Sequence, residues 1–117
     1  MYARVTHLQI LPEKMEEFRR AMETIRPEVR KQAGFRGLVV LREGTTNAPE
    51  ATSIAMWESL EHLRASEKNL FLYQALSRLL VLCKGFPTIR EHEVLACELA
   101  PPETPPTQKK GSLDDTV

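Results

Sequence analysis

The chain has 117 residues, of which 42% are hydrophobic, and 16 Lys plus Arg balance 16 Asp plus Glu. This length suits one domain with a modest core, and the balanced charge argues against binding to nucleic acid or an anionic membrane. No apolar stretch reaches the roughly 18 to 20 residues of a membrane span, and the first residues lack the features of a signal peptide. We therefore expect a cytoplasmic protein without nucleic-acid or membrane partners.

A strand and a long helix are predicted first. Residues 2–10 are rich in side chains that suit a strand, and Pro12 suits the first turn of a helix. The apolar residues that follow recur every three or four positions, as in an amphipathic helix: Met15, Phe18, Met22, Ile25 and Val29. Pro27 lies inside this pattern, so a kink or an interruption is expected near Arg26. Gly34 can adopt the left-handed conformation that ends a helix.

The middle of the chain predicts a hairpin followed by two helices. Residues 35–43 and 51–57 have the composition of strands, and turn-forming residues separate them. Ser59 is suited to cap a short helix. Asn69 is suited to cap a second helix, in which apolar residues again recur every three or four positions.

The chain changes character after its last predicted strand, residues 88–98. Half of the eight prolines fall within residues 100–117, together with several charged residues. Such a composition cannot bury a core. We predict one domain over residues 1–99 and a Pro-rich, disordered tail over residues 100–117.

The predicted order of elements is strand, helix, strand, strand, helix, strand. This twofold βαβ pattern predicts an α+β fold with a ferredoxin-like antiparallel sheet and helices on one face. The strands that would expose the other face carry several apolar residues: Val39, Leu41, Ile54 and Met56. Such a face is unlikely to remain in water, and symmetric self-association is the commonest way to cover it. We therefore predict a homodimer formed through the open sheet face.

Several chemistries have no motif in this sequence. It contains no glycine-rich phosphate loop and no serine nucleophile elbow, and its three histidines lack metal-ligand spacing. Cys83 and Cys97 also lack the close spacing of a metal site or a redox pair. We expect both cysteines to be small buried hydrophobic residues and predict no metal site.

Four segments, taken together and in order, resemble the antibiotic biosynthesis monooxygenase family of dimeric α+β barrels. They are the end of the first strand at residues 10–14, the helix carrying Met15, Glu17 and Phe18, the turn at residues 34–37, and Met56-Trp57-Glu58-Ser59 leading to His62-Leu63. The resemblance covers roughly residues 2–98. It implies a dimer whose two sheets join face to face, with a pocket in each subunit between sheet and helices.

Some members of that family oxidise polycyclic phenols or quinols with molecular oxygen and need neither metal nor flavin, whereas others degrade haem. The first chemistry is physically reasonable, because a phenol that loses its proton becomes an anion able to reduce oxygen. The protein then needs only to bind the anion, favour it and exclude water. We therefore predict that no cofactor is required.

Four residues are candidates for substrate contact: Trp57, Tyr73, His7 and His62. Trp57 matches the tryptophan that relatives place near the pocket, and the alternative is plain core packing. The hydroxyl of Tyr73 could reach the same cavity, or the ring could simply pack. His7 would serve as a base if it faced inward, and otherwise lies at a surface or interface. His62 is alternatively a solvated helix residue, and His92 is expected to be exposed or at an interface.

At two places the sequence departs from the family pattern, and each departure argues against a particular activity for this chain. Haem-degrading relatives have an asparagine on the first strand, which is absent here, and a histidine where Glu67 stands. Phenol-oxidising relatives use an amide close to the tryptophan, where this chain has Thr52 and Ser53. The leading hypothesis is a homodimeric, cofactor-independent monooxygenase that acts with O2 on a small aromatic or quinol-like molecule. The alternative is a non-catalytic small-molecule-binding or structural dimer of the same fold.

Overall fold

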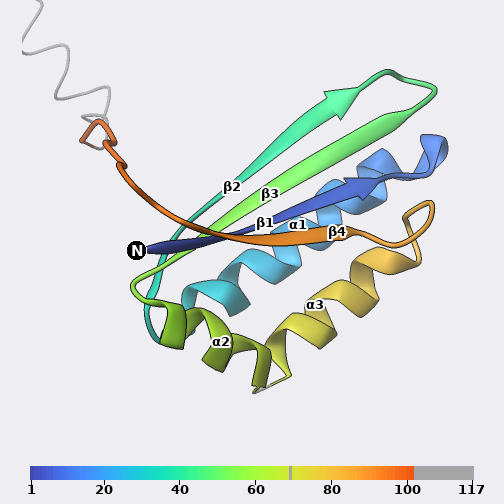
Figure 1. Cartoon of the computed structure of the whole chain (residues 1–117). Helices are drawn as coiled ribbons and strands as arrows, with labels where there is room; N and C mark the ends of the chain where they lie inside the picture. Colours follow the sequence, from blue (N-terminus) through green and yellow to red (C-terminus); the bar gives the residue numbers. More distant parts are fainter. Residues whose placement is uncertain (69, 102–117) are drawn as a thin grey trace, which may run out of the picture.

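The computed structural model describes residues 1–68 and 70–101. In chain order its elements are β1 (Tyr2–Gln9), the 3-10 turn η1 (Pro12–Lys14), α1 (Met15–Arg30), β2 (Phe35–Gly44), β3 (Pro49–Trp57), α2 (Leu60–Lys68), α3 (Phe71–Leu80) and β4 (Thr88–Glu93). This order confirms the predicted α+β, ferredoxin-like fold, with the second helix divided into α2 and α3 (Figure 1). All of the predicted tail from residue 102 onward lies outside the described residues.

The four strands form one antiparallel sheet in the order β2-β3-β1-β4, and the helices lie on one of its faces (Figure 1). Arg4 of β1 is opposite Ala55 of β3 and Glu91 of β4. Because paired residues face the same side of a sheet and neighbours along a strand face opposite sides, Arg4, Thr6 and Leu8 all point toward the helices. The register therefore determines which side chains can reach the interior.

Helix α1 buries Phe18, Ile25 and Val29 against the sheet, which confirms the predicted apolar face. The helix runs unbroken through Pro27, so an interruption near Arg26 is wrong. Proline removes one backbone hydrogen bond of the helix. The buried neighbours Ile25 and Val29 hold the last turns on the sheet, and this packing outweighs the loss.

Two of the predicted helix caps can be compared with the structure. The Ser59 hydroxyl accepts a hydrogen bond from the backbone N–H of His62 at 3.1 Å, which confirms Ser59 as the cap of α2. The N-cap position of α3 is Leu70, with a left-handed φ of 67° and no side-chain cap bond. The predicted cap, Asn69, lies outside the described residues.

Strand β4 ends at Glu93, so its predicted extension to Glu98 is wrong. Glu93 already pairs with Tyr2, the first residue of β1, and the N–H of Val94 reaches the carbonyl of Met1 at 2.9 Å. The chain beyond Val94 therefore has no further strand residues to pair with.

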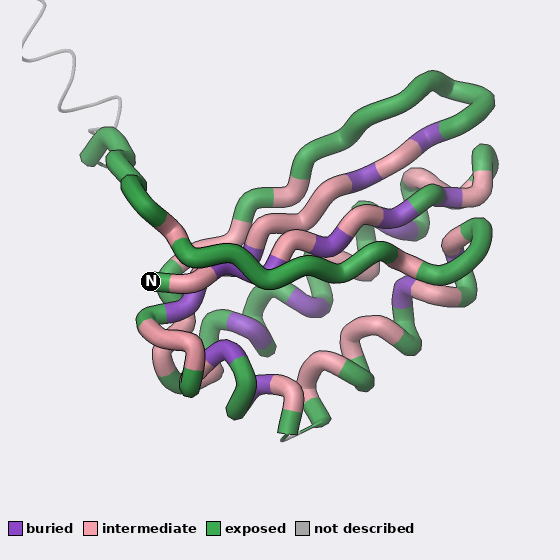
Figure 2. The backbone as a smooth tube through the Cα atoms, viewed as in Figure 1, coloured by how far each residue is buried: buried purple, intermediate pink, exposed green. Residues whose placement is uncertain are grey.

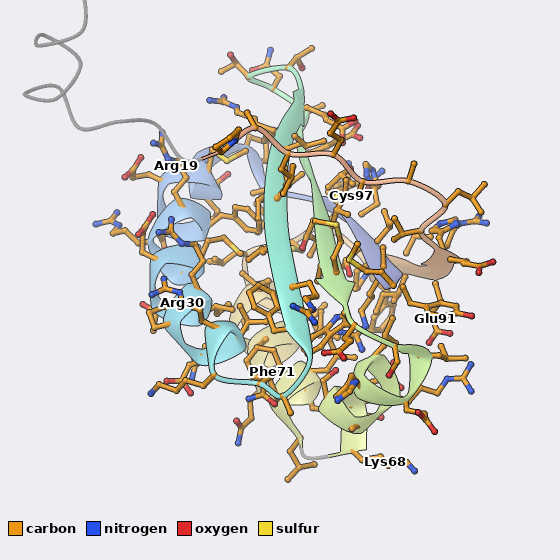
Figure 3. The ribbon with its side chains drawn as sticks, turned by 90° about the vertical axis from the view of Figure 1, so that its left-hand side faces the viewer. Arg19, Arg30, Lys68, Phe71, Glu91 and Cys97 are labelled. Atoms are coloured by element: carbon orange, nitrogen blue, oxygen red, sulfur yellow. The ribbon has the colours of Figure 1, made fainter. Side chains whose placement is uncertain are left out.

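The cysteines are less buried than predicted. Cys97 is exposed, so its predicted burial is wrong, and its Sγ lies 4.0 Å from Met56 Sδ on the side of the sheet away from α1 (Figure 3). Cys83 is only half-buried. The position of Cys97 follows from the early end of β4, because the chain there has left the sheet.

The core lies between the sheet and the helices, where buried residues follow alternate positions of β1 and β3 (Figure 2). One cluster surrounds Leu8 and Phe18, and a second contains Val29, Trp57 and Leu63. The opposite face of the sheet carries Val39 and Leu41, which are 43% and 45% exposed. Within residues 1–68 and 70–101, no helix combines the length and apolarity required to cross a membrane.

Candidate functional site

A cavity of about 70 Å³ lies between the helix-facing side of the sheet and the helices. Strand β1 contributes Arg4 and Thr6, and β3 contributes Ser53 and Trp57. The remaining lining is apolar and comes mainly from α1 and α3: Leu8, Phe18, Met22, Ile25, Val29, Leu38, Ala55, Phe71, Leu72, Ala75, Leu76 and Leu79. A mostly apolar cavity with a few converging polar groups is the usual form of a small-molecule site.

Trp57 lines this cavity and is also part of the core. Its side chain is completely buried, and its ring meets Phe35 edge to face, with centroids 5.7 Å apart and planes at 75°. The indole Nε1–H has no acceptor among the described residues. The two interpretations of Trp57 are therefore compatible, because one ring packs in the core and also borders the cavity.

Arg4 is a site residue that the sequence reasoning missed. It is only 3% exposed, and its Nη2 donates to the Leu63 carbonyl at 2.9 Å, to Ser66 Oγ at 3.0 Å and to Glu67 Oε2 at 3.2 Å. Its guanidinium carbon lies 5.8 Å from the centroid of the Trp57 ring. The signal was present in the alternation of β1, since Arg4 has the same parity as Leu8, but a charged residue was not expected inside.

Glu67 stands where haem-degrading relatives have histidine, and here it forms an ion pair with Arg4. The side chain of Arg4 is 4% exposed and that of Glu67 is 35% exposed, so the pair runs from the interior to the surface. A buried cation with one carboxylate partner is tolerated only where hydrogen bonds also satisfy it. The bonds from Arg4 to α2 meet this need and tie α2 to β1.

Tyr73 does not line the cavity with Trp57. It is 67% exposed and borders a separate, open apolar groove between α3 and β4 that also contains Phe86 and Ile89. The cavity side of α3 carries Leu72, Ala75, Leu76 and Leu79, which follow helical spacing. Tyr73 lies next to that face, one residue after Leu72, and points elsewhere.

His7 faces the open side of the sheet, away from the cavity. Its Nε2 lies 3.0 Å from Glu50 Oε1, and its Nδ1 lies 3.1 Å from Thr52 Oγ1, whose hydroxyl in turn donates to Glu43. His7 points away from the cavity because successive side chains along β1 face opposite sides of the sheet. The condition for His7 to act as a base in the cavity, an inward position, is not met.

His62 lies on α2 and does not line the cavity. Its Nδ1 is 2.8 Å from Ser59 Oγ, and its ring covers Gly34, where a Cβ atom would come within 2.2 Å of His62 Cγ. Gly34 has the left-handed φ of 78° that was predicted, but α1 ends at Arg30 with Lys31 as its C-cap, so Gly34 lies in the turn before β2 and does not cap the helix. His62 therefore joins the start of α2 to the turn between α1 and β2.

Titratable groups are scarce around the cavity. Among the described residues, its lining contains Arg4 but no histidine, cysteine, aspartate or glutamate. Across residues 1–68 and 70–101, no group of three or more such side chains is arranged to hold a metal ion. What the lining offers a ligand is N–H donors and hydroxyls, from Arg4, Trp57, Thr6 and Ser53.

The fold and the cavity together define a ferredoxin-like α+β protein with a small-molecule-type cavity beside a buried tryptophan. The model of the family described as antibiotic biosynthesis monooxygenase matches residues 1–70. The chain therefore belongs to the antibiotic biosynthesis monooxygenase family. No curated protein matches the sequence.

Solved structures of low sequence identity share the fold. SnoaB, a cofactor-independent oxygenase from Streptomyces nogalater, superposes with a TM-score of 0.63 at 16% identity, over 82% of this chain and 94% of that one. Rv0793 from Mycobacterium tuberculosis gives a TM-score of 0.68 at 12% identity, over 81% and 95% of the two chains. A conserved protein from Methanosarcina mazei Go1 gives 0.67 at 19% identity, over 79% and 91%.

Proposed function

We propose that this protein is a cofactor-independent monooxygenase that oxidises a small aromatic or quinol-like substrate with O2. The observation that carries the proposal is the largely apolar cavity that the buried Trp57 lines. Family membership supports the proposal, as does the fold shared with SnoaB, which is described as a cofactor-independent oxygenase.

The chemistry asks little of the protein. For an anthrone substrate, the carbon that gains one oxygen atom loses two hydrogens, and the second oxygen atom leaves as water. The electrons come from the deprotonated substrate, so the cavity has to bind the anion, keep water out and admit O2. Because the cavity lining, among the described residues, has no carboxylate or imidazole to act as a base, the substrate has to enter it already deprotonated.

The cavity is smaller than an aromatic substrate. At about 70 Å³ it has less than half the volume of an engineered cavity of roughly 150 Å³ that binds benzene. Entry of an aromatic ring therefore requires part of the wall to move. The largest share of the lining comes from helix α3, which contributes Phe71, Leu72, Ala75, Leu76 and Leu79.

The proposal includes a homodimer formed through the open sheet face. Val39 and Leu41 are 43% and 45% exposed there, and Ile54 and Met56 are half-buried on the same side. An apolar sheet face of this kind is characteristic of an interaction surface. A two-fold dimer would pair the face with itself and leave both cavities on the outer sides of the joined sheets.

Oxygen uptake by the purified protein tests the activity. A panel of anthrones and hydroquinones is added to the folded protein, and O2 consumption and products are compared with protein-free controls at the same pH. The proposal predicts uptake above background, with one water formed for each oxygen atom inserted. Background uptake across the whole panel, by protein shown to be folded, would reject it.

A non-catalytic binding protein is the second candidate, and a specific observation favours it. On β3 the cavity is lined by the Ser53 hydroxyl, where phenol-oxidising relatives use an amide, and the described lining contains no base. This candidate predicts that aromatic ligands quench the fluorescence of Trp57 without forming product. A purely structural module would instead lose stability on Trp57→Phe while showing no ligand response. Haem degradation has less support than either candidate, because no histidine is found among the described residues that line the cavity.

A further inference from the structure

An open groove of about 340 Å³ lies between α1 and β2. It shares Phe18 and Met22 with the cavity that Trp57 lines and is otherwise separate from it. Most of the groove is apolar, but three arginines and only one glutamate also border it. The lining residues are Met15, Phe18, Arg19, Met22, Glu23, Arg26, Val40, Leu41, Arg42 and Ala51. The groove therefore combines apolar surface with an excess of positive charge, in a chain whose formal net charge is zero.

Two of these three arginines have no carboxylate partner. Arg26 Nη1 donates to Glu23 Oε2 at 3.0 Å, so the charges of this pair largely offset each other. Arg19 and Arg42 are exposed, and neither forms an ion pair with any residue that the structure describes. Arg19 borders the groove from α1 and Arg42 borders it from β2. Such a groove suits a partner that carries carboxylates next to an apolar side chain.

The chain itself carries a segment of matching chemistry outside the described residues. This acidic segment, residues 113–115, reads Leu-Asp-Asp and contains both aspartates of the protein. In an extended segment, successive side chains point to opposite sides. Asp114 and Asp115 can therefore meet the two walls of the groove, at Arg19 and Arg42, while the leucine supplies apolar contact.

We infer that the acidic segment docks in the groove between α1 and β2 of its own chain, where its two carboxylates pair with Arg19 and Arg42 and Leu113 packs on the apolar lining. Each exposed ion pair is weak by itself. The covalent tether, however, raises the local concentration of the segment to roughly the millimolar range. Contacts of modest strength are then enough to keep the segment bound for much of the time. The inference does not depend on the proposed oxygenase activity.

The chain is long enough to make this contact. Strand β4 ends at the end of the sheet where β2 begins, and the chain after β4 passes from the β4 side of the sheet toward the β2 side, where α1 also lies (Figure 3). Arg42 is about 23 Å from Phe35 along β2, at about 3.3 Å per residue. The chain from Pro101 to Asp114 can extend over about 45 Å. The acidic segment therefore reaches the groove without any change in the sheet.

Carbodiimide coupling of the full chain tests the contact, because this reagent joins a carboxylate directly to a nearby lysine amine. Arg19→Lys keeps the charge and supplies the amine. Arg20→Lys is the matched control, since Arg20 is the next residue of α1, is exposed and does not line the groove. Mass spectrometry should find Asp114 or Asp115 coupled several-fold more to position 19 than to position 20, within one chain. Salt at about 1 M, where the Debye length is about 3 Å, should remove the difference. Equal coupling in the two variants, including none in either, or coupling only between two chains, would overturn the inference.

A second measurement changes only residues beyond β4, so the core of the domain is left intact. Asp114→Asn combined with Asp115→Asn removes both charges of the acidic segment, and Glu103→Gln is the control that removes a charge outside it. In nitrogen–proton correlation spectra, we expect the double variant to shift the backbone amide signals of Met22 and Val40, which line the groove, and the control to leave them in place. Unchanged signals in the double variant, or equal shifts in the control, would contradict the inference.

Discussion

The imidazole of His62 occupies the space that a side chain at Gly34 would need. A Cβ atom built on Gly34 would lie 2.2 Å from His62 Cγ, and the φ of 78° is already unfavourable for other residues. The N–H of Glu58 also donates to the Gly34 carbonyl at 2.7 Å. These two contacts of Gly34 join three parts of the fold, namely the turn after α1, the end of β3 and the start of α2.

Gly34→Ala should therefore destabilise the protein by about 2–5 kcal/mol, the sum of a left-handed backbone cost and an overpacking cost. Gly85→Ala is the matched control, because Gly85 has a similar φ of 79° and no atom within 4 Å of its Cβ position. The control should lose only about 1–2 kcal/mol. Urea denaturation gives both free energies of unfolding. Equal losses of stability in the two variants would show that the His62 side chain moves aside with no cost in free energy.

Arg4→Met should destabilise the protein by about 1–3 kcal/mol, because it removes the donor to three acceptors on α2 and leaves buried oxygens without it. We expect a smaller loss of stability than when a fully buried ion pair is broken, because the Glu67 side chain is 35% exposed and its carboxylate can be solvated by water. Arg36→Met is the control, because Arg36 and Glu58 form an exposed pair, 56% and 54% accessible. It should cost at most about 1 kcal/mol. Similar urea midpoints for the two variants would contradict a structural role for Arg4.

Leu41→Asp should convert the proposed homodimer to a monomer, because it places a charge on the open face of the edge strand β2, where Leu41 is 45% exposed. Light scattering coupled to size exclusion measures the mass. Val81→Asp serves as control, since Val81 is 73% exposed and follows the end of α3, away from that face. A dimer that survives Leu41→Asp would place the interface elsewhere, and a monomeric wild-type protein would reject the dimer.

The two thiols should differ in reactivity. Burial raises the pKa of the Cys83 thiol above its ordinary value, whereas Cys97 is exposed. Only the thiolate reacts, so at neutral pH iodoacetamide should modify Cys97 first, and modification of Cys83 should keep rising to a higher pH than for a free thiol. Mass spectrometry of the Leu41→Asp variant measures both rates without a partner subunit near Cys97. Faster labelling of Cys83 at neutral pH would contradict the burial.

The local pattern of the sequence was enough to predict the order of the elements. Apolar spacing located α1, turn chemistry located the hairpin, and Ser59 marked the start of α2, because these features depend on neighbours in the chain. The same locality explains the errors. Proline at position 27 was expected to kink or interrupt α1, but the helix is not interrupted, because Ile25 and Val29 are buried on the sheet.

The site depended on contacts between distant residues. The sequence placed Trp57 at the end of a strand, and the cavity beside it agrees with a pocket between sheet and helices. The strand register and the rotation of the helices decide which residues line the cavity together with Trp57. They turn Arg4 inward and His7 outward, and they leave Tyr73 in a separate groove. A charged residue inside is favourable only when specific acceptors surround it. The acceptors that surround Arg4 belong to Leu63, Ser66 and Glu67. They lie about sixty positions further along the chain and meet Arg4 only in the folded protein.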